Sequence, residues 1–238
     1  MSSRQTREQS APVAYTESGV VAAITIGQSP RPDVMDEIRP LLGAGVRVIE
    51  IGALDGLTAE GIAVMRPAED DHTLVTQLRD GREVLLGRRH IIPRIQACVD
   101  RVQVQAGLIM MLCTGTFPPF QTQRLMVYPE HLLFQTARAV MEGGHVGVLT
   151  PSARQIGDQE RRWREVAPAV TVRAFSPYTD GDDLDGACAD FVAAGIDLVV
   201  LDCLGYTIAL KREVRQKTGR PVLLARTVLA RAAAELVG

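Results

Sequence analysis

Short apolar runs rich in Val and Ile alternate along the chain with longer segments whose apolar residues recur at helical spacing. The runs are continuous, which is typical of parallel strands buried on both faces. They predict seven strands, at 21–27, 46–51, 108–113, 146–150, 170–175, 198–203 and 222–225. The periodic segments predict helices at 34–42, 74–80, 88–105, 129–142, 153–166, 183–194, 208–218 and 227–236. This alternation indicates an α/β fold with parallel sheets.

One stretch of sequence returns without gaps. ACVDRVQVQAGLIMMLCTG begins at Ala97, and ACADFVAAGIDLVVLDCLG begins at Ala187. Each copy places one cysteine on an amphipathic helix and a second in C-x-G at the end of an apolar strand. The repeat predicts two similar halves, and if these face each other, the thiols of Cys113 and Cys203 meet across one cleft.

The organisation of the chain follows from this repeat. VAAITIGQSPRPDV and VGVLTPSARQIGD each open a half as strand, turn and helix, whereas the segment at about 58–88 has no counterpart. We predict a polar tail over 1–19, a first half over 20–128 plus 226–238, and a second half over 129–225. The final helix is expected to pack back on the first half.

Composition narrows the functional class. The 238 residues carry 26 basic and 28 acidic side chains, a net charge of −2, so no electrostatic footprint for nucleic acid is present. No apolar run approaches the roughly 20 residues of a membrane span, and the polar tail lacks the apolar region of a signal peptide. We therefore expect a cytoplasmic protein with free thiols.

The sequence also predicts that no cofactor and no metal is bound. Lys211 and Lys217 are the only lysines and fall on one predicted surface helix, which disfavours a pyridoxal phosphate Schiff base. Glycine motifs for nucleotides are missing. The four cysteines are spaced by 15, 75 and 15 residues without a C-x-x-C pair, which disfavours a zinc site.

Candidate binding residues gather where predicted strands end, the usual place for ligands in doubly wound sheets. Free backbone N–H groups at a following helix start would bind a carboxylate. Arg31 either clamps a carboxylate bidentately or is solvated, and Tyr206 either lines the pocket or packs. The full set is Ser29, Arg31, Thr114, Gly115, Thr116, Thr150, Ser152, Gly205, Tyr206 and Thr207.

The paired cysteines suggest a chemistry. A thiol at a helix N-terminus shifts toward thiolate, which is a good base near neutral pH. Cys113 and Cys203 on opposite sides of a carbon would remove a proton from one face and return one to the other. A lone cysteine is more often core than catalytic, and Cys98 and Cys188 are read as core. Asp202 should point away from the cleft as a structural, helix-capping or catalytic carboxylate.

Three segments carry a resemblance to a known family. TIGQSPRPDV, LDCLGYT and ARTVLARAAAELVG resemble the AroM family, which is similar at greater distance to the aspartate/glutamate racemase superfamily. The resemblance implies two flavodoxin-like halves related by a pseudo-twofold axis, each supplying one active-site cysteine, here Cys113 and Cys203. This sequence has Leu204-Gly205 where glutamate racemases carry Thr-His, which argues against an acidic amino-acid substrate.

Three functions stay open at this point. The first is cofactor-independent racemisation or epimerisation of a small carboxylate, such as an amino acid or a derivative, by two cysteine bases. The second is an isomerase or decarboxylase of a dicarboxylate that uses one cysteine. The third is a non-enzymatic domain that senses a small ligand. A homodimer is the commonest default for the assembly.

Overall fold

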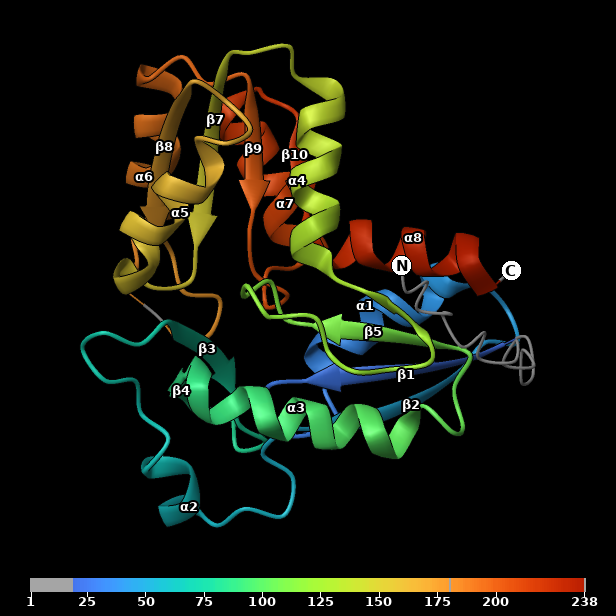
Figure 1. The fold of residues 1–238 in the computed structure, drawn as a ribbon. Helices are drawn as coiled ribbons and strands as arrows, with labels where there is room; N and C mark the ends of the chain where they lie inside the picture. Colours follow the sequence, from blue (N-terminus) through green and yellow to red (C-terminus); the bar gives the residue numbers. More distant parts are fainter. Residues whose placement is uncertain (1–18, 180, 238) are drawn as a thin grey trace, which may run out of the picture.

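The computed structural model describes residues 19–179 and 181–237, and these form two α/β halves with one parallel sheet each (Figure 1). The strand orders are β2-β1-β5-β6 and β8-β7-β9-β10, so the halves share one topology. The first sheet consists of β1 (Val20–Thr25), β2 (Arg47–Gly52), β5 (Leu108–Leu112) and β6 (Leu125–Val127). The second consists of β7 (His145–Thr150), β8 (Ala169–Ala174), β9 (Leu198–Leu201) and β10 (Val222–Leu224). The predicted fold class is confirmed.

The central strands are buried along their whole length because helices cover both faces of each sheet. Every residue of β1, β5 and β9 is buried. This explains why these strands read as continuous apolar runs in the sequence. The short edge strand β6 lacks such a run and was not among the predicted strands.

Helices form the outer layers. On the first sheet, α3 (Arg88–Val102) packs against one face and α1 (Pro32–Leu42) against the other. On the second, α6 (Leu184–Ala193) and α7 (Ile208–Thr218) cover one face, and α5 (Ile156–Trp163) follows the short 3₁₀ turn η1 (Ala153–Gln155) on the other. Among residues 19–179 and 181–237, no helix is long and apolar enough to cross a membrane.

The last helix of each half packs on the opposite half. α4 (Pro129–Val140) follows β6 of the first sheet but contacts β10, whereas α8 (Ala225–Val237) follows β10 but contacts α1, β5 and β6 (Figure 1). One apolar core therefore runs through both halves, from Ile38 on α1 through Leu229 on α8 to Trp163 on α5. Of the predicted tail, only Gly19 lies within the described residues. The division of the chain at 128/129 and 225/226 stays a prediction.

The predicted helix over 74–80 is wrong. Residues Thr73–Gln77 form β3, which pairs antiparallel with β4 (Glu83–Gly87), and the extra segment also holds the short α2 (Ala59–Ala63). Asp80-Gly81 supplies the turn, where Gly81 has a φ of 86° that other residues rarely adopt. An Asp-Gly pair between β-branched runs is a hairpin pattern, and it outweighs the local helical spacing.

The β3–β4 hairpin reaches across to the second half. Gln155 Nε2 donates to the Thr73 carbonyl at 2.9 Å, and Ser176 Oγ donates to Glu83 Oε2 at 2.5 Å. His72 Nδ1 lies 2.6 Å from Asp158 Oδ2 on α5. The segment without a counterpart in the repeat therefore covers one side of the space between the two sheets.

Candidate active site

Cys113 and Cys203 lie at equivalent places in the two halves. Cys113 directly follows β5, and Cys203 comes two residues after β9. Each sulfur accepts an N–H from the glycine two residues later, Gly115 or Gly205, at 3.3 Å in both cases. Both thiols line one cavity between the halves. The repeat thus brings two sulfurs with matching backbone donors to a single site.

The cavity between the thiols is small and enclosed. Its volume of about 20 Å³ holds roughly one water. Its walls come from the strand ends of both halves and from the hairpin: Ile26, Arg31, Leu74, Val75, Thr76, Leu112, Cys113, Thr114, Gly115, Pro151, Gln155, Tyr178, Cys203 and Leu204. Over half of these side chains are apolar, so charged groups inside are poorly solvated.

Burial governs the protonation of the thiols. It raises the pKa of Cys113 to about 12 and that of Cys203 to about 11, against smaller opposing effects of the backbone N–H groups. The expected helix-dipole effect is weak here, because β6 rather than a helix follows Cys113, and α7 begins only at Ile208. Both cysteines are therefore thiols at neutral pH in this closed cavity.

Arg31 lines the cavity, but its donors are committed. Its Nε and Nη2 bind the two carboxylate oxygens of Asp33 at 2.8 and 2.6 Å. Nη1 donates to Thr76 Oγ1 at 3.1 Å, and Nη2 also donates to Tyr178 Oη at 3.2 Å. Arg31 is therefore buried rather than solvated. Its guanidinium already binds the Asp33 carboxylate, so these donors are not free for the carboxylate of a substrate.

Asp202 sits beneath the site, with its side chain only 1% exposed. Trp163 Nε1 donates to its Oδ2 at 3.3 Å, whereas Oδ1 has no partner among the described residues. Its carbonyl accepts a hydrogen bond from Thr114 Oγ1 of the first half at 3.0 Å. The backbone of Asp202 therefore ties the two cysteine loops together, and its carboxylate lies in the core rather than capping a helix.

Three of the predicted hydroxyl residues support loops and helix ends. Ser29 Oγ donates to Asp55 Oδ2 at 2.5 Å. Ser152 accepts from the Arg154 N–H in η1, and Thr207 caps α7 by accepting from the Leu210 N–H.

The remaining predicted residues divide between cavity and core. Thr114 and Gly115 line the cavity, and Thr116 lines the passage beside it. Thr150 Oγ1 donates to Gln155 Oε1 at 2.8 Å and so orients a cavity side chain. Tyr206 is fully buried and donates to the Phe175 carbonyl at 2.7 Å, so it packs against the site from behind.

Sequence reasoning missed Tyr178, Thr76 and Gln155. Tyr178 follows β8, whose carboxyl end lies at the same edge as those of β7 and β9, so its position after a strand was a usable signal. Thr76 lies on β3, and it was missed because residues 74–80 were wrongly predicted to form a helix. Gln155 falls in the first turn of a correctly placed helical segment, where nothing in the sequence marks it.

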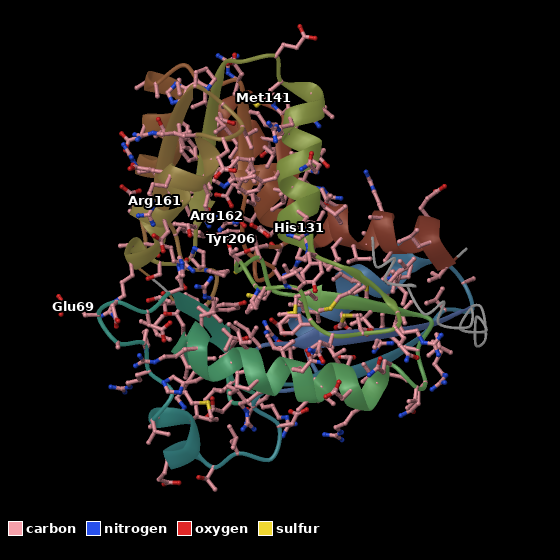
Figure 2. The ribbon with its side chains drawn as sticks, in the orientation of Figure 1. Glu69, His131, Met141, Arg161, Arg162 and Tyr206 are labelled. Atoms are coloured by element: carbon pink, nitrogen blue, oxygen red, sulfur yellow. The ribbon has the colours of Figure 1, made fainter. Side chains whose placement is uncertain are left out.

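A passage of about 40 Å³ lies beside the cavity and shares Leu74, Thr114, Gly115 and Gln155 with it. A surface groove of about 770 Å³ shares His72, Thr73 and Asp158 with this passage, and its walls include Glu69 on the loop before β3 and Arg161 on α5. Figure 2 shows Arg161 and Arg162 on α5 above the loop that carries Glu69. A charged substrate would meet both signs of charge on this path.

No group of three or more His, Cys, Asp or Glu side chains that could hold a metal ion exists within the described ranges.

Comparisons with known proteins identify relatives of this chain. Residues 21–237 match the AroM protein family. A comparison with curated protein sequences gives no significant match. Unliganded arylmalonate decarboxylase has a TM-score of 0.59 at 16% identity, over 92% of this chain and 93% of that one. Allantoin racemase from Klebsiella pneumoniae has a TM-score of 0.61 at 13% identity, over 92% and 88%. Glutamate racemase from Aquifex pyrophilus has a TM-score of 0.57 at 15% identity, over 92% and 84%. At these identities the likeness shows a shared fold.

Proposed function

Because this chain belongs to the AroM family and folds like the racemases and the decarboxylase above, we propose that it is a cofactor-independent racemase or epimerase of a small carboxylate. The observation that carries the proposal is the pair of thiols, Cys113 and Cys203, which border one cavity from opposite halves. One sulfur, as thiolate, takes the α-proton. The other, as thiol, gives a proton to the opposite face of the carbon.

The cavity favours a substrate with a single carboxylate. Arg31 is the only positively charged residue among the described residues that line it, and Asp33 already neutralises that charge. A second carboxylate would have to enter a mostly apolar space without a free cation, which is unfavourable. The proposed substrate is therefore an amino acid or derivative with one carboxylate, held by backbone N–H groups and the Thr76 hydroxyl, whose oxygen accepts from Arg31 and whose proton can go to the carboxylate.

Incubation in heavy water tests this function. We expect single enantiomers of a suitable small carboxylate to take up deuterium at the α-carbon while optical activity is lost. The assay uses a broad panel of amino acids and derivatives, with proton NMR and chiral chromatography as readouts. A panel without exchange or racemisation would contradict the proposal. Compounds that raise thermal stability without turnover would instead indicate a sensing domain.

The pH dependence gives a second prediction. Below the pKa of about 11 for Cys203, each added pH unit raises the thiolate fraction tenfold. We therefore expect kcat/KM for racemisation to rise about tenfold per unit between pH 7 and pH 10 and to fall above about 12, where Cys113 also loses its proton. Initial rates across this range provide the measurement.

A single-cysteine reaction is the second candidate, because the fold is also that of arylmalonate decarboxylase and the surroundings of the two thiols differ. An enzyme that uses one thiol only as an acid would keep a flat rate between pH 7 and pH 10. A flat profile together with carbon dioxide release, and no α-proton exchange, would favour decarboxylation over racemisation.

A further inference from the structure

The two thiols have different neighbours although their loops repeat. A Cβ added to Gly115, beside Cys113, would meet the apolar Leu74 Cδ2 at 2.6 Å. A Cβ added to Gly205, beside Cys203, would meet the Tyr178 hydroxyl at 2.4 Å. The loop of the first cysteine therefore borders on a hydrocarbon side chain of the hairpin, and the loop of the second borders on a phenol.

The direction of the hydrogen bonds at Tyr178 is fixed by Arg31. A guanidinium has only donors, so the Tyr178 oxygen must accept from Arg31 Nη2, and its own proton remains free. Tyr178 lines the same cavity as Cys203, and its hydroxyl lowers the pKa of this thiol, so the free proton is available to the Cys203 sulfur. Asp33 holds the other side of the guanidinium, which gives the chain Asp33–Arg31–Tyr178–Cys203.

The donor remains protonated when a nearby sulfur loses its proton. Burial raises the pKa of Tyr178 far above its usual range. The titratable and charged groups that act on Cys203 come from both halves of the molecule. They are Tyr178 and Arg31, which favour the thiolate, and Asp202, Cys113 and Tyr206, whose negative forms would oppose it.

We propose that Tyr178 is a positioning residue that determines which of the two thiols ionises first. It donates to the Cys203 sulfur, so that Cys203 ionises before Cys113. The hydrogen bond stabilises the thiolate selectively, because a charged acceptor binds a donor more strongly than a neutral one. Cys113 also feels the charge of Arg31, but among the described residues no hydroxyl acts on its sulfur as Tyr178 acts on Cys203. The pKa of Cys113 is about 12, against about 11 for Cys203.

The consequence of this inference for catalysis rests on the proposed function. Cys203 first loses its proton to solvent. Its thiolate then takes the α-proton of the enantiomer that faces it, and the electron pair of the C–H bond moves into the carboxylate. The thiol of Cys113 donates its proton to the opposite face, which leaves Cys113 as thiolate and Cys203 as thiol. The free protein ionises Cys203 before Cys113. It can therefore deprotonate the enantiomer that faces Cys203 without first moving the negative charge to Cys113.

Competitive labelling of the full chain by methyl methanethiosulfonate, at pH 7 to 9 without substrate, tests the inference. In Tyr178→Phe we expect the Cys203 thiolate population to fall about tenfold. A more basic thiolate is also a better nucleophile, so the labelling rate should fall by only about threefold. The readout is the ratio of Cys203 to Cys113 labelling in the same sample, by peptide mass spectrometry. Because both thiols share one cavity, opening of the cleft affects them alike.

Tyr206→Phe is the matched control, since it removes another buried phenol oxygen that binds the Phe175 carbonyl and not a thiol. The labelling ratio should stay unchanged in this variant. An unchanged ratio in Tyr178→Phe, or an equal change at both cysteines, would overturn the inference. The ratio needs no turnover, so a failure of racemisation in the wild type would count against the proposed function alone.

Discussion

Replacing either Cys113 or Cys203 by Ala is expected to lower the racemisation rate by about 10³-fold, a typical loss when a general acid or base is removed. Each variant keeps one thiol and should still exchange the α-proton of one enantiomer. Cys113→Ala retains the thiol beside Tyr178, so its one-sided exchange should be the faster of the two near neutral pH. Opposite enantiomers should be active in the two variants, because the sulfurs line the cavity from opposite halves.

Deuterium uptake into separate enantiomers measures this outcome. Cys98→Ala is the control, since Cys98 lies on α3 in the core of the first half and occupies the other position of the repeat. It should lose some stability but keep racemisation. A variant at Cys113 that racemises at the wild-type rate would exclude the two-base mechanism and leave the single-cysteine reaction.

Arg226→Met is expected to lower the free energy of unfolding by about 3 kcal/mol, at the lower end of the range for ion pairs with a buried partner, because Arg226 is buried while Glu37 is partly exposed. The Arg226 side chain is 1% exposed and lies 2.7 Å from Glu37 Oε2. Its Nε and Nη2 both donate to the Leu204 carbonyl, at 3.0 and 2.6 Å, directly behind Cys203. Methionine fills similar space but leaves this carbonyl without the Arg226 donors and the Glu37 carboxylate with the Ile208 N–H in place of a cation.

The free energies of unfolding of Arg226→Met and Arg231→Met, each measured in urea, are compared with that of the wild type. Arg231 lies on the same helix, α8, but is exposed, so its replacement should change the free energy of unfolding by no more than about 0.5 kcal/mol. Equal stability of the two variants would show that Arg226 holds α8 neither to Glu37 on α1 nor to the Cys203 loop.

The parts of the fold that were predictable are those set by local pattern. Buried parallel strands such as β1 and β5 appear as unbroken apolar runs, and the repeat around Cys113 and Cys203 shows that two loops are equivalent. The β3–β4 hairpin was mistaken because Leu74, Leu78 and neighbouring apolar residues also fit a helical spacing. The Asp80-Gly81 turn resolves that ambiguity in favour of the hairpin.

The electrostatics of the site could not be predicted because they depend on contacts between distant segments. Arg31 meets Tyr178 147 positions further along the chain, and this contact decides which donors are free. The raised pKa values of both thiols follow from enclosure by the hairpin and the opposite half, which no local motif encodes. Sequence therefore located the sulfurs but not their state of protonation.

The exchange of α4 and α8 between the halves has a consequence for motion. The chain crosses from one half to the other twice, where α4 and α8 begin, and both crossings lie on the side of the molecule away from the hairpin (Figure 1). We expect rotation about the line between these two tethers to be the easiest relative movement, and it would separate β3 and β4 from α5. Since the resting cavity has room for roughly one water, the proposed reaction requires this opening before a substrate binds, and the opening rate would then set an upper limit on turnover.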